Sequence, residues 1–175
     1  ESVQTNKGRI KTNCVVNAAG LQADAVSALA RIDHFTIHPR KGEYYVFDKV
    51  LNGFVQQILF PVPTPISKGI VVTPTVDGNI LVGPNSQVVE NKIDSATTLG
   101  GLDEVFSGAL RLVPKLAEKK NRIIANFCGL RPESDTKDFI LESYDEVRIC
   151  VNAAGMKSPG LTAAPAVAQT VAFLL

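Results

Sequence analysis

Arg131, in the segment GLRPES, is the residue best suited to bind an anionic ligand. It follows an apolar run that is typical of a strand, and Pro132 stiffens the chain just after it. A planar, permanently charged guanidinium can hold a carboxylate or a phosphate through two parallel hydrogen bonds. The alternative is a structural ion pair with a nearby acid, Glu133, Asp135 or Asp138.

A second candidate is the loop SPGLTAAP, residues 158–165, which precedes the last predicted helix. Thr162 is a good N-cap residue, and Pro165 would then fall in the first turn, where its missing N–H costs nothing. The N–H groups near Gly160 to Ala164 would point outward, with the positive end of the helix dipole behind them. Such a helix start binds anions or carbonyl oxygens, although ordinary capped helices have the same pattern.

The five residues VNAAG occur twice, at 16–20 and at 151–155. Each copy ends a predicted strand and precedes a predicted helix. A strand, small residues, a glycine and a helix bring the backbone close to a ligand at the carboxyl end of the strand. We interpret both copies as binding corners; coincidence is the alternative, because alanine and glycine are common.

Tyr44 and Tyr45 are adjacent in a predicted strand, so their side chains face opposite sides and one reaches the open face of the sheet. The two histidines, His34 and His38, could act as bases near pH 7. No nucleophile pattern accompanies them, and we expect surface or strand-edge positions for both.

Composition excludes several classes of protein. Hydrophobic residues make up 45% and charged residues 20% of the 175 residues, as in a folded globular protein. A net charge of +1 without a basic block argues against nucleic-acid binding. Cys14, Cys128 and Cys150 are scattered, which predicts buried free thiols and no metal site. The sequence has no membrane-spanning run and no signal peptide, and we expect a reducing, cytoplasmic setting.

The predicted elements form a mainly antiparallel sheet with helix cover, an α+β fold. Helices are expected at Leu21 to Arg31, at Thr97 to Leu112 and at the end of the chain. Asp77-Gly78 predicts a hairpin between Val71-Val72 and Ile80-Leu81. Strands are expected at Ser2–Thr5, Arg9–Lys11, Cys14–Asn17, Glu43–Phe47, Gln56–Phe60, Gly69–Thr73, Asn79–Val82, Arg122–Phe127, Phe139–Glu142 and Val147–Val151, with the Phe139–Glu142 strand joining the middle sheet.

Five segments in order resemble the FAD-dependent oxidoreductases of the D-amino-acid-oxidase superfamily, and within it the glycerol-3-phosphate dehydrogenase-like group. They are VVNAAGLQAD (15–24), RKGEYYVFD (40–48), GIVVTPTVDGNILVGP (69–84), GLRPESD (129–135) and NAAGMKSPGLTAAPA (152–166). The resemblance implies a substrate domain at residues 34–144, flanked by two pieces of an α/β FAD-binding domain at 1–33 and 145–175.

The resemblance also implies residue roles. Arg131 would bind the acidic group of the substrate, and Tyr44 would face the substrate. The cofactor FAD would lie along two sets of residues, the diphosphate side at Ala18, Ala19 and Gly20, and the flavin ring at Gly155, Met156, Ser158, Gly160, Leu161 and Thr162.

The implied function is oxidation of a small anionic secondary alcohol by hydride transfer to FAD. Val71 replaces a histidine of the related 2-hydroxyglutarate dehydrogenases, which favours glycerol 3-phosphate as the substrate. A 2-hydroxyglutarate or amino-acid oxidase and a non-catalytic interaction module stay open as alternatives. The catalytic base is not identified: Tyr44 and a residue outside this chain are both open.

The amino-terminal GxGxxG is absent, the chain starts at Glu1, and its only methionine is Met156. We therefore expect a carboxy-terminal part of a longer enzyme, inactive without its amino-terminal FAD-binding segment. An electron-acceptor protein or a quinone is a further implied partner, and a location peripheral to the membrane would fit it.

Overall fold

The computed structural model describes residues 2–63, 69–144 and 147–175. The chain forms two units, one made of Glu1–Pro39 with Arg131–Leu175 and the other of Arg40–Leu130. Strands β4 (Ile37–Phe47) and β8 (Ile123–Ser134) each contribute residues to both units.

The unit Arg40–Leu130 is built on a five-stranded sheet in which β8 also pairs with β4. Its other strands are β5 (Val71–Pro74), β6 (Ile80–Gly83) and β7 (Gln87–Val88), in the order β5-β6-β4-β7. Each of these neighbouring pairs is antiparallel. The β5–β6 hairpin closes at Asp77-Gly78, where Gly78 takes a φ of +89° that favours glycine.

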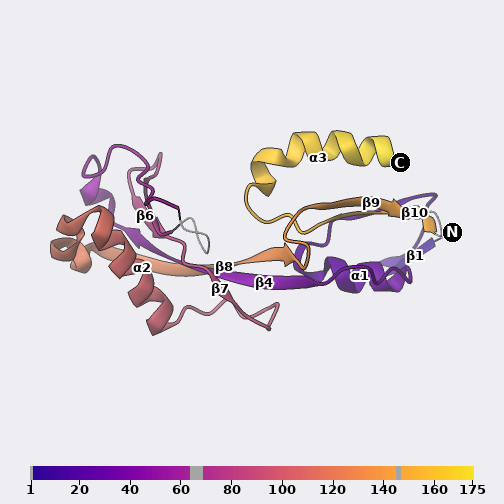
Figure 1. Cartoon of the computed structure of the whole chain (residues 1–175), viewed down its shortest axis with the longest axis horizontal. Coiled ribbons are helices and arrows are strands. Elements are labelled where there is room, and N and C mark those ends of the chain that lie inside the picture. Colours follow the sequence, from indigo (N-terminus) through magenta and orange to yellow (C-terminus); the bar gives the residue numbers. More distant parts are fainter. Residues whose placement is uncertain (1, 64–68, 145–146) are drawn as a thin grey trace. The chain divides into compact units, whose positions relative to one another are not determined.

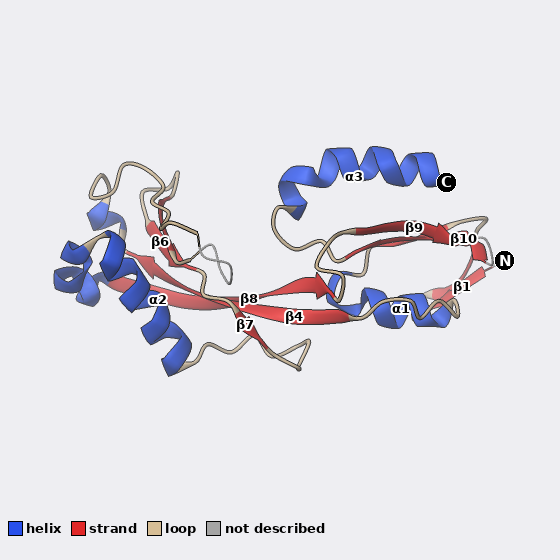
Figure 2. Cartoon of the chain, viewed as in Figure 1, coloured by secondary structure: helices blue, strands red, loops and turns tan. Residues whose placement is uncertain are grey.

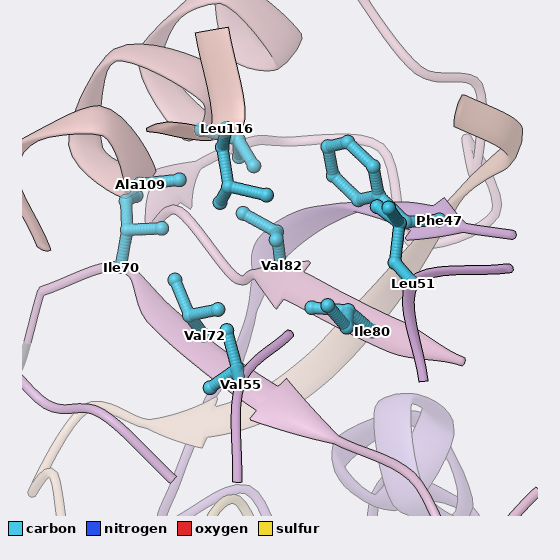
Figure 3. Packing of buried hydrophobic residues seen from close by; sticks show 10 residues of the cluster. Phe47, Leu51, Val55, Ile70, Val72, Ile80, Val82, Ala109 and Leu116 are labelled. Carbon is cyan, nitrogen blue, oxygen red and sulfur yellow. The ribbon is translucent and has the colours of Figure 1, made fainter. Parts of the chain in front are cut away.

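Helices cover one face of this sheet: α2 (Leu99–Leu112), the 3-10 helix η3 (Pro114–Arg122) and the short η2 (Lys49–Leu51). Figure 2 shows these helices in blue beside the strands in red. Their apolar side chains converge on those of β4, β5 and β6 (Figure 3). The core consists of Phe47, Leu51, Val55, Ile70, Val72, Ile80, Val82, Val105, Ala109 and Leu116.

A buried carboxylate joins α2 to β4. Glu43 is 0% exposed, and its carboxylate accepts hydrogen bonds from the backbone N–H of Thr98 and from Asn85 Nδ2 at 3.1 Å. Asn85 Oδ1 in turn accepts from the backbone N–H of Glu43 at 2.8 Å. A Cβ at Gly101 would lie 1.4 Å from Glu43 Oε2, so only glycine fits there. The carboxylate thus sits over the first turn of α2, where the helix dipole favours a negative charge.

The other unit contains a three-stranded sheet in the order β3-β10-β9. Strands β3 (Val15–Asn17) and β10 (Val147–Ala154) are parallel, and β9 (Ile140–Tyr144) is antiparallel to β10. Figure 1 shows helices α1 (Ala23–Leu29) and α3 (Gly160–Leu174) on opposite sides of this sheet. A separate hairpin joins β1 (Ser2–Thr5) to β2 (Gly8–Lys11), and the core comprises Ala23, Phe35, Ile37, Ile140 and Ala154.

The α+β prediction is confirmed, and the antiparallel middle sheet carries its helix cover as expected. Some details of the predicted elements are wrong. Gln56–Phe60 is not a strand, and only Leu59 forms an isolated bridge, to Val72. Strand β9 pairs with β10 and not with the middle sheet. The predicted helix at Leu21 begins instead with the 3-10 turn η1 (Gly20–Gln22), and α1 follows it.

Helix α3 differs from α1 and α2 in its composition. Its 15 residues, GLTAAPAVAQTVAFL, include no charged side chain, and none of these described residues is buried. Leu161 is 94% exposed and Phe173 is 89% exposed. Among the residues that the structure describes, none of the helices has the length and apolar character needed to cross a bilayer.

Candidate functional site

The two VNAAG copies lie side by side. In the parallel pair β3–β10, Val16 is opposite Val151 and Asn17 is opposite Asn152. Asn17 Nδ2 donates to Asn152 Oδ1 at 2.7 Å, and both side chains are buried. Because parallel strands end at the same edge of a sheet, the two small-residue corners leave the sheet next to each other. The sequence repeat is therefore also a structural pair.

The first corner, Ala18-Ala19-Gly20, is open. Ala18 and Ala19 are exposed, and Asn17 Oδ1 accepts a hydrogen bond from the backbone N–H of Ala19 at 3.3 Å. Gly20 has a φ of +58°, and a Cβ built on it would meet no atom within 4 Å. Space is thus available for a ligand at the carboxyl end of β3.

The second corner is packed on its inner side. β10 ends in buried Ala153 and Ala154, and the next residue, Gly155, has a φ of +70°. A Cβ at Gly155 would lie 2.8 Å from the backbone oxygen of Asp138 and 3.1 Å from Ser134 Cβ. This corner therefore rests against the turn that follows β8.

The loop from Met156 to Gly160 then leads into α3. The backbone N–H of Lys157 donates to Gly155 O at 2.8 Å, and that of Gly160 donates to Lys157 O at 2.7 Å. Met156 and Gly160 are half-buried, and Ser158 is exposed.

The predicted N-cap at Thr162 is wrong. Helix α3 begins at Gly160 with Pro159 as its N-cap, without a side-chain cap, so Thr162 and Leu161 are exposed residues of the first turn. Pro165 consequently lies inside the helix. The turn at 157–160 starts the helix earlier than the Thr162 pattern indicates. The backbone N–H groups of Leu161 and Thr162 have no hydrogen-bond partner among the described residues.

Arg131 belongs to the same unit as both corners. It is half-buried on β8, two residues before Glu133, whose carboxylate forms an ion pair with Lys157. The structure thus ties the loop after the second corner to the end of the strand that carries Arg131. The sequence alone does not indicate this pair, because Lys157 and Glu133 are 24 positions apart.

Tyr44 lies in the unit Arg40–Leu130, where it stacks on Phe127 with ring centroids 4.8 Å apart and an interplanar angle of 10°. A Cβ at Gly83, whose φ is +133°, would lie 2.8 Å from Tyr44 Cδ1. Glycine at 83 and the ring of Phe127 therefore set the position of the Tyr44 ring. Phe127 is a contact that the sequence analysis missed, because it depends on the pairing of β8 with β4.

The cysteines and histidines show no feature of a catalytic or metal site in the described residues. Burial raises the pKa of the Cys128 and Cys150 thiols, so both favour the neutral form. In residues 2–63, 69–144 and 147–175, no cluster of three or more His, Cys, Asp or Glu could hold a metal ion. His34 is exposed and stacks on Tyr144 at 5.1 Å.

Tyr144 gives a prediction for alkaline pH. Burial, and then the hydrogen bond to Glu142 at 2.7 Å, raise its pKa from 10.0 to about 12. The phenol therefore loses its proton more readily in the unfolded chain, and its contribution to stability is complete below pH 10 and is lost as the pH rises toward about 12. As the pH rises from 10 to about 12, the urea midpoint should fall less in Tyr144→Phe than in the wild type. An equal fall in both proteins would contradict the raised pKa of Tyr144.

The sequence profile of the FAD-dependent oxidoreductases matches residues 1–174. The chain belongs to this family. A glycerol 3-phosphate dehydrogenase from Caloramator mitchellensis is 39% identical over 171 residues, which are 98% of this chain and 35% of that protein. The family-level resemblance inferred from the five segments is thus confirmed.

A solved structure supports the same family. L-alpha-glycerophosphate oxidase from Mycoplasma pneumoniae, reduced with dithionite and with FAD bound, matches with a TM-score of 0.82 and 35% identity over 93% of this chain and 42% of its own. The mitochondrial L-2-hydroxyglutarate dehydrogenase of Arabidopsis thaliana is 27% identical over 180 residues, covering 91% of this chain and 37% of that protein. The chain spans less than half the length of each of these relatives.

Proposed function

We propose that this chain is the carboxy-terminal part of a flavin-dependent dehydrogenase that oxidises a small anionic secondary alcohol, with glycerol 3-phosphate as the favoured substrate. The observation that carries the proposal is the pair of VNAAG corners on adjacent parallel strands, in the same unit as Arg131. The glycerol 3-phosphate dehydrogenase at 39% identity and the L-alpha-glycerophosphate oxidase at 35% identity support the substrate preference.

The residues at the two corners fit FAD. Ala18 and Ala19 are exposed, a Cβ on half-buried Gly20 would meet open space, and none of the three has a side chain larger than a methyl group, as a diphosphate requires for close approach. The first turn of α3 offers the N–H groups of Leu161 and Thr162 to a carbonyl or anionic edge, such as the flavin C2 carbonyl and N1. In this proposal, Gly155, Met156, Ser158 and Gly160 border the flavin ring, residues 1–33 and 145–175 are pieces of the FAD-binding domain, and residues 34–144 form the substrate domain.

When bound, FAD would accept at N5 the hydride that leaves the alcohol carbon, while the hydroxyl proton passes to a base and a ketone forms. The role of this chain is positioning. Arg131 would hold the anionic group and so fix the reacting carbon over the ring. The amino end of α3 would stabilise negative charge that develops on the ring. Tyr44 would line the substrate pocket, and the sheet that carries it would exclude water.

The test begins with the colour of the full-length protein. We expect a bound flavin, seen as visible absorbance near that of free FAD, and bleaching of this absorbance when glycerol 3-phosphate is added without oxygen. L-2-hydroxyglutarate and glycine, added in parallel, should bleach it much more slowly. Bleaching by either of these instead would assign the chain to the alternative hydroxy-acid or amino-acid oxidases, and a colourless protein would favour a non-catalytic interaction module.

The proposed setting is the cytoplasm or the face of a membrane, where an acceptor protein or a quinone would reoxidise the flavin. The same assay decides between acceptors. Rapid reoxidation by a soluble quinone with slow reoxidation by oxygen would indicate a dehydrogenase, and rapid reoxidation by oxygen would indicate an oxidase.

A further inference from the structure

The loop of residues 155–160 touches the end of β8 through an ion pair. Lys157 Nζ donates a charge-assisted hydrogen bond to Glu133 Oε1. The Glu133 side chain is only 10% exposed, and that of Lys157 is 27% exposed. An ion pair shielded to this degree is screened less by water and salt than a surface pair is.

A second contact lies beside the first. Gly155 packs against the turn at Ser134–Asp138 so closely that a Cβ would meet Asp138 O at 2.8 Å. That turn is itself closed by Ser134 Oγ, which donates to Asp138 O at 2.6 Å. The loop is therefore held to the end of β8 both at its glycine corner and at Lys157.

Local hydrogen bonds alone give this loop little support. Lys157 N donates to Gly155 O and Gly160 N donates to Lys157 O, both within the loop, and Ala163 N donates to Pro159 O, which joins the loop to α3. These three bonds shape the loop and start α3, but none of the three reaches β8. The connection to the end of β8 comes from the ion pair and from the packing of Gly155.

We propose that Glu133 and Lys157 are a positioning pair, which keeps the loop 155–160 at a fixed distance from the Arg131 end of β8. This inference rests on the proposed function, because it gives the pair the task of holding the flavin-side backbone in register with the substrate-side guanidinium. Neither residue is required to touch the substrate. A displacement of about 1 Å between such groups can lower a rate by about 100-fold, which makes the restraint useful.

The experiment is a double-mutant cycle in the full-length protein with its cofactor. The variants are Lys157→Met, Glu133→Gln, the two combined, and Lys157→Arg as the conservative replacement. Hydrogen exchange of the amides between Gly155 and Gly160 reports on the loop itself, without any need for turnover. Flavin absorbance, FAD dissociation constants, kcat and KM are measured for the same proteins.

We expect Lys157→Met to speed exchange in the loop by about tenfold or more, and to lower kcat by about tenfold with a smaller change in KM. Lys157→Arg should restore both to near the wild-type values, since a guanidinium can also pair with Glu133. The double variant should be no worse than the more strongly affected single variant, because either substitution already breaks the Glu133–Lys157 pair.

Unchanged loop exchange in Lys157→Met, or fully additive effects in the double variant, would overturn the positioning role. Failure of the proposed function looks different. In one such outcome, the full-length protein contains no flavin while both substitutions still change loop exchange in a coupled, non-additive manner. That result would confirm the structural restraint and refute its role in catalysis. A loss of kcat without any change in exchange would assign Lys157 a direct role and would also overturn the proposal.

Discussion

Replacing Arg131 by alanine should lower kcat/KM for glycerol 3-phosphate by about 1000-fold in the full-length protein, through loss of a charge-assisted contact worth several kcal/mol. Arg131 is half-buried on β8, so its interaction with an anionic group would be strengthened by partial exclusion of water. If the guanidinium only binds the anion, KM rises. If it also aligns the reacting carbon, kcat falls as well.

Two comparisons make this result specific. Arg131→Lys keeps the charge but loses the bidentate geometry, and it should recover only part of the activity. Arg9→Ala removes an exposed arginine of the β1–β2 hairpin and should leave the kinetics unchanged. The neutral substrate glycerol should be almost insensitive to Arg131→Ala. Wild-type kinetics for Arg131→Ala with glycerol 3-phosphate would remove this residue from the site.

Gly101→Ala should destabilise the unit Arg40–Leu130 by about 3 kcal/mol, a large effect for one methyl group. The new Cβ would lie 1.4 Å from Glu43 Oε2 and 2.9 Å from Thr98 Oγ1. Glu43 is fully buried, so its carboxylate has no route into solvent when it is displaced from the helix start. Urea unfolding measures the loss.

Gly100→Ala is the matched control, on the same helix and one residue earlier. A Cβ at Gly100 would meet no atom within 4 Å, and the position is exposed. Since alanine favours helices over glycine, this variant should be as stable as the wild type or slightly more so. Equal destabilisation by both substitutions would show that the cost lies in the helix backbone and not in the Glu43 contact.

Local patterns sufficed where the determinants are close in sequence. The Asp77-Gly78 turn specified the β5–β6 hairpin, and helical spacing located α2 to within two residues at its start. They failed where pairing partners are distant. Gln56–Phe60 has strand-like residues but bridges only through Leu59, and β9 pairs with β10 because of contacts that no local pattern in 139–144 specifies.

In the candidate site too, local sequence patterns indicate some features, and others become visible only in the fold. The VNAAG repeat indicated two similar corners, yet the hydrogen bond between Asn17 and Asn152 spans 135 positions and became visible only in the fold. Thr162 looked like a cap because its residue type is right, but the backbone turn before Gly160 starts the helix earlier. The Glu133–Lys157 ion pair can likewise be recognised only when the positions of β8, β10 and the loop 155–160 are known.

The uncharged surface of α3 has a practical consequence for work with this polypeptide. Its net charge is only +1 at pH 7 and its isoelectric point is about 8.0, so mutual repulsion between molecules is weak at neutral pH. The exposed side chains of Leu161 and Phe173 can then form hydrophobic contacts between molecules, because α3 has no charged side chain that would repel a second copy. When this polypeptide is prepared by itself, colloidal stability should improve in acidic buffer of low ionic strength, where its net charge is larger.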